Sequence, residues 1–153
     1  PTNLYGPNDN FDLETSHVLP ALIRKFHEGK QNNAESVIVW GTGDPKREFL
    51  YVDDLADACL FIMQKEFLSR EHKNKLLFNI GSGRDISIKE LAELIKEITG
   101  FKGKIVFDTS IPDGTPQKLL DISELKTLKW CAATTLKDGI AGTYAAFQKN
   151  KLL

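Results

Sequence analysis

Cysteine is scarce in this 153-residue sequence, and long hydrophobic runs are missing. The only two cysteines, Cys59 and Cys131, are too few for a disulfide framework and lack the spacing of a metal site. No apolar run approaches the roughly 20 residues that span a membrane, and no signal peptide opens the chain. We therefore expect a cytoplasmic protein in which both thiols are reduced and buried.

An excess of charge of either sign is also lacking. The formal net charge is -1, so no basic field points to a nucleic acid and no acidic tail points to a basic partner. His17, His27 and His72 do not stand at metal-ligand spacing, and no metal site is expected. The 41% hydrophobic content suits one domain with its own core, and phosphate binding would require a local cluster of cations.

Common motifs of catalysis and nucleotide binding are absent as well. The sequence contains no Gly-x-Ser-x-Gly, and no Gly-x-Gly-x-x-Gly opens a helix after a strand. Gly41-Thr42-Gly43 is not a phosphate loop, because it lacks the Gly-Lys-Ser/Thr ending and no helix follows it directly. From its residues alone, we expect the chain to bind an anionic ligand without displaying a complete active site.

The alternation of predicted strands and helices favours an α/β or α+β fold. Apolar stripes at helical spacing, bounded by capping residues, predict helices, and short apolar runs between turn residues predict strands. Expected strands cover 1–5, 37–40, 48–51, 76–80 and 104–107, with a short extended piece at 119–122. Expected helices run from an N-cap at Ser16 to Gly29, from Asp53 to 63, from a Ser87–Glu90 capping box to Gly100, for two turns from Ser123, and onward from Thr135.

The helix expected to follow Asp53 is unusual because residues 55–63 are apolar nearly all round, with Asp57 as their one charge. Such a helix is buried on more than one side. The first expected strand, at 1–5, has no partner before it in the chain. Both features predict a piece of a larger protein, which would expose apolar surface when it stands alone.

The segment from Trp40 to Asp57 combines an aromatic ring, a glycine turn and two cations. The guanidinium of Arg47 would donate hydrogen bonds to two phosphate oxygens. The alternative is a surface arginine paired with an acid, and the sequence pattern alone favours this alternative. Trp40 would stack on a base or sugar, or else pack in the core, which is the commoner place for tryptophan. Lys118 and Lys25 are further candidate phosphate contacts, or plain surface lysines.

Two other polar residues, His17 and Asn3, stand where a ligand would matter. His17 opens a helix after a polar loop, and an imidazole there can titrate near neutrality in a cleft, although a surface histidine is the simpler interpretation. Asn3 lies within an apolar strand, where a buried amide must find partners, either in a loop or on a ligand.

Two runs of residues resemble extended short-chain dehydrogenase/reductases. Pro1-Thr2-Asn3-Leu4-Tyr5-Gly6-Pro7 is similar to the segment after the catalytic helix of that family, and the run from Arg47 to Asp57 is similar to its sugar-nucleotide half. Further runs narrow the resemblance to members that act on GDP-linked deoxyhexoses: Asp9-Asn10-Phe11, Ser16-His17-Val18, Val39-Trp40-Gly41 and Pro112-Asp113-Gly114-Thr115-Pro116. The resemblance spans the whole chain and corresponds to the second half of those enzymes.

The resemblance implies an α/β fold, namely the C-terminal substrate-binding part of an extended short-chain dehydrogenase, with strands and helices left over from a truncated Rossmann sheet. Residues 1–153 would form the sugar-nucleotide-binding domain, and the N-terminal NADP-binding domain would be absent from this chain. The full-length protein would be a cytoplasmic homodimer that binds neither nucleic acid nor membrane.

The resemblance also implies roles for individual residues. His17 matches the catalytic histidine of the family, and it would contact NADP near the nicotinamide together with Pro1, Thr2, Asn3 and Leu4. The GDP-sugar would be held by Lys25, Trp40, Arg47 and Lys118, with Lys25 at a position where the family often has arginine.

The implied reaction is 3,5-epimerisation and NADPH-dependent 4-reduction of GDP-4-keto-6-deoxy-D-mannose. The ketone at C4 acidifies the protons at C3 and C5, and His17 would act as the acid of the epimerisation. The family's Gly-rich turn, its Ser-Tyr-Lys set and the cysteine partner of the histidine are missing, so we expect these 153 residues alone to be inactive. Two alternatives stay open: a colitose-type GDP-deoxyhexose epimerase/reductase, and a non-catalytic nucleotide-sugar binding module.

Overall fold

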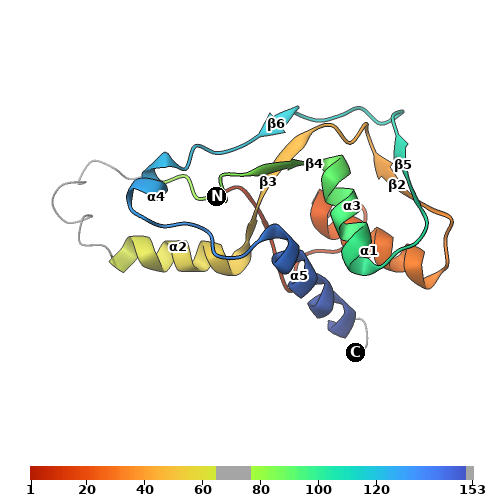
Figure 1. Ribbon diagram of the computed structural model, residues 1–153, viewed down its shortest axis with the longest axis horizontal. Coiled ribbons are helices and arrows are strands. Elements are labelled where there is room, and N and C mark those ends of the chain that lie inside the picture. The colour runs from red at the N-terminus through yellow and green to blue at the C-terminus, as the bar shows by residue number, and fades with distance from the viewer. Residues whose placement is uncertain (65–76, 151–153) are drawn as a thin grey trace.

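The computed structural model describes residues 1–64 and 77–150, with α2 and α4 at one end and α1, α3 and α5 grouped towards the other (Figure 1). In chain order the elements are β1 (Asn3–Tyr5), α1 (Val18–Gln31), β2 (Ser36–Trp40), β3 (Lys46–Tyr51), α2 (Val52–Gln64), β4 (Asp85–Ser87), α3 (Ile88–Thr99), β5 (Lys104–Asp108), β6 (Gln117–Lys118), α4 (Ser123–Thr127) and α5 (Leu136–Asn150). Parallel strand pairs and helices on both flanks confirm the α/β class.

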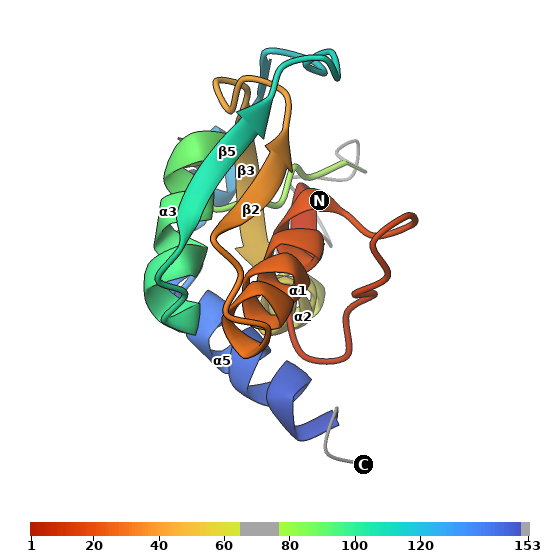
Figure 2. The same ribbon diagram turned by 90° about the vertical axis from the view of Figure 1, so that its right-hand side faces the viewer.

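β3 is the central strand of the larger sheet. β1 pairs with it in parallel along residues 49–51, and β4 pairs antiparallel along residues 46–48. β6 adds a parallel pairing of only two residues, in which Lys118 stands opposite Arg47. β2 and β5 form a separate parallel pair, which Figure 2 shows side by side with α1 and α3 next to it.

The core has two clusters of buried side chains. The larger one joins α1, α3 and α5 to the strands, and its buried helical residues recur at the spacing that the sequence predicts. They include Leu19, Ile23, Phe26, Leu91, Ile95, Ile140 and Tyr144. The smaller cluster packs α2 and α4 against β3 and contains Leu50, Ala58, Leu125 and Trp130.

Two carboxylates hold α2 to the segment that precedes α5. Asp54 accepts hydrogen bonds from the backbone N–H groups of Ala133 at 3.3 Å and Thr134 at 3.1 Å. Asp57 accepts a hydrogen bond from the indole N–H of Trp130 at 2.8 Å. Asp54 therefore lies on the side of α2 that the rest of the chain covers.

Two predictions about burial are wrong. Only Asp54 and Ala58 are buried among the residues of α2, so the helix is covered on one side rather than on several. Cys59 and Cys131 are free, but both are exposed and not buried. Leu60 and Met63 of α2 are 54% and 68% exposed, which agrees with the exposed apolar surface that the sequence predicts for a piece of a larger protein.

The predicted strand at 76–80 does not form across residues 77–80, and Leu76 lies outside the described residues. A single backbone bond, from the Thr2 N–H to the Ile80 carbonyl at 3.1 Å, holds the end of this segment beside β1. One bond does not make a ladder, so the apolar run 76–80 is a weaker strand signal than its composition indicates.

Helix-end signals are confirmed for α3 and wrong for α1. Ser87 and Glu90 form the predicted capping box, and Gly100 ends the helix with φ at 74°. The N-cap of α1 is His17 and not Ser16, no side chain caps it, and the helix continues past Gly29 to Gln31.

Candidate functional site

Two cations of the predicted site meet across a strand pair. Arg47 on β3 and Lys118 on β6 are register partners, and partners on neighbouring strands project to the same face of a sheet. Arg47 Nη1 donates to the carbonyl of Lys46 at 2.7 Å. No carboxylate of residues 1–64 and 77–150 forms an ion pair with either cation, so the acid-paired interpretation of Arg47 is wrong within that part.

Lys25 and Trp40 form a second pair. The Lys25 ammonium lies 4.6 Å from the centroid of the Trp40 ring and donates to the carbonyl of Ile38 at 3.1 Å. This is cation–π geometry, and partial burial lowers the pKa of Lys25. Trp40 is 56% exposed, so the core-packing interpretation of this residue is wrong.

A clasp closes the turn between β2 and β3. Asp113 accepts hydrogen bonds from the Thr42 N–H at 2.9 Å and the Thr42 hydroxyl at 2.6 Å. These bonds hold the pKa of the Asp113 carboxyl below its usual range. Gly41 has φ at 80°, and a side chain there would collide with the Asp113 carboxylate. The clasp therefore fixes the loop 109–116 beside Trp40's end of β2.

The same loop also lies against Arg47. A Cβ on Gly114 would stand 3.3 Å from Arg47 Nη2. Two residues later, the carbonyl of Pro116 accepts a hydrogen bond from the Lys46 N–H at 2.8 Å. The loop thus runs from the clasp along the Arg47 guanidinium and into β6, which carries Lys118. Asp113 is a site residue that its turn signal alone did not single out.

His17 is exposed at the start of α1, eight residues before Lys25. Eight residues are a little over two turns, so both side chains lie within one broad face of the helix, about 12 Å apart along its axis. Asp12 orders the preceding loop by accepting hydrogen bonds from the N–H groups of Thr15 at 2.9 Å and Glu14 at 3.0 Å.

Asp9 is an electrostatic neighbour of His17 that the sequence pattern did not indicate. Burial raises the pKa of its carboxyl, while the Asn10 N–H, which donates at 2.7 Å, and the charge of His17 act in the opposite direction. Its Oδ2 is buried and has no hydrogen-bond partner among the described residues.

The predicted cofactor residues lie at the start of the chain, beside β3. Thr2 Oγ1 and Asn3 Nδ2 donate to the carbonyl of Glu48 at 3.1 Å and 2.8 Å, so Asn3 has the partner that its place in a strand requires. Pro1 is exposed, and Leu4 lines a cavity of about 190 Å³ together with residues 5–9 and Val52.

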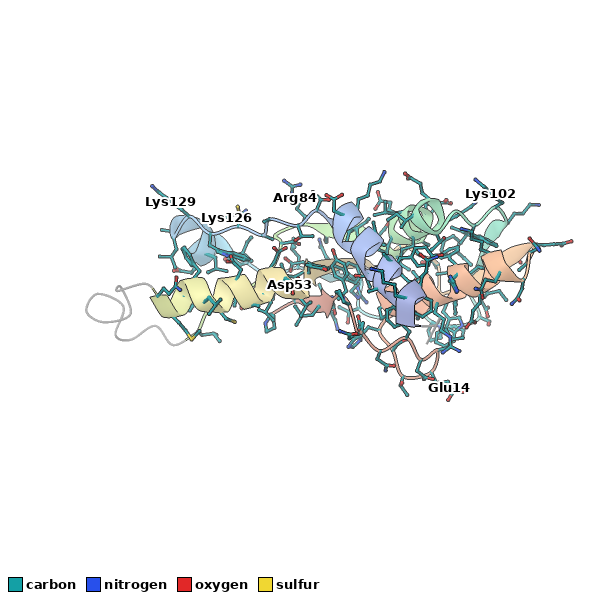
Figure 3. The ribbon with its side chains drawn as sticks, turned by 90° about the horizontal axis from the view of Figure 1, so that it is seen from below. Glu14, Asp53, Arg84, Lys102, Lys126 and Lys129 are labelled. Carbon is teal, nitrogen blue, oxygen red and sulfur yellow. The ribbon has the colours of Figure 1, made fainter. Side chains whose placement is uncertain are left out.

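A cavity of about 710 Å³ contains none of the predicted site residues. Arg84 and Lys126 line it and lie along the same side of the molecule (Figure 3). Two acids, Asp85 and Glu90, line it as well and offset their charge. We therefore place the candidate site at Lys25, Trp40, Arg47 and Lys118, where no described carboxylate forms an ion pair with a cation.

Two other kinds of site are not found in the described ranges. His, Cys, Asp and Glu side chains of residues 1–64 and 77–150 do not form a group of three or more that suits a metal ion. In the same residues, no helix combines the length and apolar character needed to cross a membrane. The candidate site is thus built from cations, one aromatic ring and a histidine.

The chain is similar to a family of epimerases and dehydratases and to GDP-sugar synthases. The NAD dependent epimerase/dehydratase family matches residues 1–81. GDP-L-fucose synthase 1 of Arabidopsis thaliana is 57% identical over 150 residues, which cover 98% of this chain and 45% of the relative. GDP-L-colitose synthase of Yersinia pseudotuberculosis is 36% identical over 151 residues, covering 99% and 47%.

A solved structure shows the same fold. The GDP-L-fucose synthetase of Naegleria fowleri, bound to NADP, matches with a TM-score of 0.87 at 34% identity, over 99% of this chain and 44% of that one. This chain spans about half the length of the curated relatives it matches. The family match covers more than half of its 153 residues, including His17, Trp40 and Arg47. The chain belongs to the NAD dependent epimerase/dehydratase family.

Proposed function

We propose that this chain is the sugar-nucleotide-binding part of a GDP-L-fucose synthase, which converts GDP-4-keto-6-deoxy-D-mannose to GDP-L-fucose by 3,5-epimerisation and NADPH-dependent 4-reduction. The observation that carries the proposal is the Arg47–Lys118 pair, two cations on one face, neither of which forms an ion pair with a described acid. The 57% identity to the Arabidopsis enzyme supports it. For the whole protein we propose an N-terminal NADP-binding domain, a homodimer and a cytoplasmic location.

The two pairs of residues suit the two ends of GDP. Arg47 can present a fork of N–H donors to diphosphate oxygens, and Lys118 adds a compact charge beside it. The exposed ring of Trp40 offers a stacking surface for guanine on the face opposite the Lys25 ammonium. Binding energy from these remote contacts would orient the hexose towards His17.

His17 is the proposed acid of the epimerisation. Its imidazole is exposed at the start of α1, and Asp9 lies close enough for their charges to interact. As the acid, its imidazolium form would return a proton to C3 or C5 from one face, after a base has removed the proton from the other. Guanine would lie at Trp40 beside Lys25, and the hexose would lie at His17. The separation of Lys25 from His17 along α1 leaves room for the diphosphate that joins them.

Pro1, Thr2, Asn3 and Leu4 are the proposed contacts to one edge of NADP. β1 ends at Tyr5, and α/β proteins bind dinucleotides beyond the carboxyl ends of parallel strands. The cavity beside Leu4, at about 190 Å³, is smaller than the 300 Å³ or more typical of a ligand pocket, so Pro1 to Leu4 would contact only part of the cofactor. When bound, NADPH would supply the hydride for C4.

The alternatives have less support. The colitose-type relative is 36% identical, against 57% for the Arabidopsis fucose enzyme. A non-catalytic module has no observation of its own, since the chain belongs to a family of epimerases and dehydratases.

Titration of this 153-residue chain with GDP, UDP and guanosine tests the proposal. We expect GDP to bind more tightly than guanosine, because only GDP reaches Arg47 and Lys118, and more tightly than UDP, because a purine covers more of Trp40. We also expect no NADPH oxidation with the GDP-keto-sugar. A chain that binds none of the three ligands would contradict the proposal.

A further inference from the structure

Glu48 is a buried carboxylate in the middle of β3, with 0% of its surface exposed. No described Lys, Arg or His forms an ion pair with it. Instead, Oε1 accepts a hydrogen bond from the Gly83 N–H at 2.6 Å, and Oε2 accepts one from the Leu120 N–H at 3.0 Å. A buried carboxylate is costly unless its oxygens are hydrogen-bonded, so these two backbone contacts are what the fold supplies in place of a counter-ion.

The position of Glu48 is a junction in the sheet. β4 occupies one edge of β3 at residues 46–48, so β6, which pairs with 46–47, and β1, which pairs with 49–51, follow each other along the opposite edge. Glu48 stands where that edge changes partner. Its carbonyl accepts the side-chain bonds of Thr2 and Asn3, while its carboxylate reaches the chain segments next to β4 and β6.

β6 depends on this carboxylate because its own ladder is short. Only Gln117 and Lys118 pair with β3, and a two-residue pairing fixes a strand weakly. The Leu120 N–H, two residues beyond Lys118, is held by Glu48 Oε2 and not by a backbone carbonyl of β3. On the other side, a side chain at Gly81 would collide with the same carboxylate, so the 81–83 turn closes tightly around it.

We propose that Glu48 is a positioning residue for diphosphate binding: its buried carboxylate ties the ends of β4 and β6 to β3 and thereby sets Lys118 beside Arg47. Glu48 does not touch the ligand itself. This inference rests on the proposed GDP site and adds the residue that holds its two cations in register.

A positioning role and a merely structural role can be told apart by the part of the ligand that loses its contacts. Trp40 and Lys25 lie on β2 and α1, and Glu48 makes no hydrogen bond to either element. Loss of the carboxylate should therefore weaken contacts to the diphosphate and spare contacts to the base. A general loosening of the fold would weaken both in the same proportion.

Glu48→Gln in this chain is the most selective test, because an amide has nearly the same shape as a carboxylate. Its NH2 group would face one of the two backbone N–H donors, and that hydrogen bond would be lost. We expect the affinity for GDP to fall about tenfold and the affinity for guanosine to stay within twofold of the unsubstituted chain. Glu90→Gln is the matched control, since the Glu90 carboxylate also accepts a backbone N–H, at Ser87, but lies in the α3 capping box. It should leave both affinities unchanged.

Leu120→Pro keeps the carboxylate and removes one of its donors, which gives a second route if Glu48→Gln does not fold. We expect the same selective loss of GDP affinity. Equal losses for GDP and guanosine in the folded variants, or wild-type affinity for both, would overturn the positioning role while leaving the GDP site in place. Failure of the unsubstituted chain to bind GDP would instead overturn the proposed function, and the role of Glu48 with it.

Discussion

Arg47 and Lys118 stand opposite each other on β3 and β6, and neither forms an ion pair with a described carboxylate. Neighbouring strands lie about 4.8 Å apart, so the two like charges repel across the pair. A diphosphate that bridges both cations would replace this repulsion by attraction. The pair therefore lowers the stability of the ligand-free chain and favours binding of an anion.

Lys118→Met should reduce the stabilisation of the fold by pyrophosphate against thermal unfolding. In the unsubstituted chain, pyrophosphate at 100 times its Kd should stabilise the fold by about 2.7 kcal/mol, because it binds only the folded state. Without ligand, the variant should unfold at the same or a slightly higher temperature. Lys102→Met is the control, since Lys102 projects into solvent (Figure 3). Equal stabilisation of the chain and the Lys118 variant by pyrophosphate would refute the assignment.

Trp40 should report guanine binding through its fluorescence. It is 56% exposed whereas Trp130 is 5% exposed, so acrylamide should quench mainly Trp40. Guanosine and GDP should both protect this emission if the base stacks on the ring. Trp40→Phe should abolish the quenchable fraction and weaken guanosine binding. Quenching that is the same with and without saturating GDP would show that the base lies elsewhere.

The clasp between Asp113 and Thr42 should open in acid. Hydrogen bonds from Thr42 hold the pKa of Asp113 below its ordinary value of 3.8. Since the folded pKa is the lower one, the stabilisation is complete above 3.8 and is lost as the pH falls through the folded value. The amide signal of Thr42 should titrate with that lowered pKa in NMR spectra, and Asp113→Asn should abolish the titration. A midpoint at or above 3.8 would contradict the clasp.

The uncovered face of α2 should bind hydrophobic dyes and promote self-association. Leu60 and Met63 are 54% and 68% exposed. Leu60→Lys should reduce dye fluorescence and shift sedimentation towards monomer without lowering the unfolding temperature. Ala145→Lys on α5 adds the same charge without removing a large apolar side chain, and should change neither the dye fluorescence nor the sedimentation. Monomeric, dye-free behaviour of the unsubstituted chain at high concentration would be the contrary result.

Much of the fold follows from local signals in the sequence. The stripe of α3, its capping box at Ser87 and its glycine stop at Gly100 all predict the same helix, and the structure has it. β4 and β6 were not predicted, because strands of three and two residues are too short to show alternation. The extended piece expected at 119–122 lies just beyond β6, where Glu48 replaces the backbone ladder.

The candidate site was predictable only in part. Arg47 and Lys118 are 71 residues apart in sequence, and their pairing depends on a two-residue strand ladder that no sequence pattern predicts. Trp40 looked like a core residue because it ends an apolar run, but β2 alternates and places it on the exposed face. Asp113 and Glu48 act through backbone N–H groups of distant segments, which residue spacing does not reveal.

Calorimetric titration of GDP into this chain and into its Arg47→Ala variant tests the central claim most directly. We expect the unsubstituted chain to bind GDP and Arg47→Ala to bind it at least about tenfold more weakly, since a charge-assisted fork to the diphosphate is lost. Lys102→Ala, with the same change of charge, should bind as the unsubstituted chain does. Equal GDP affinity of the unsubstituted chain and Arg47→Ala would contradict the account.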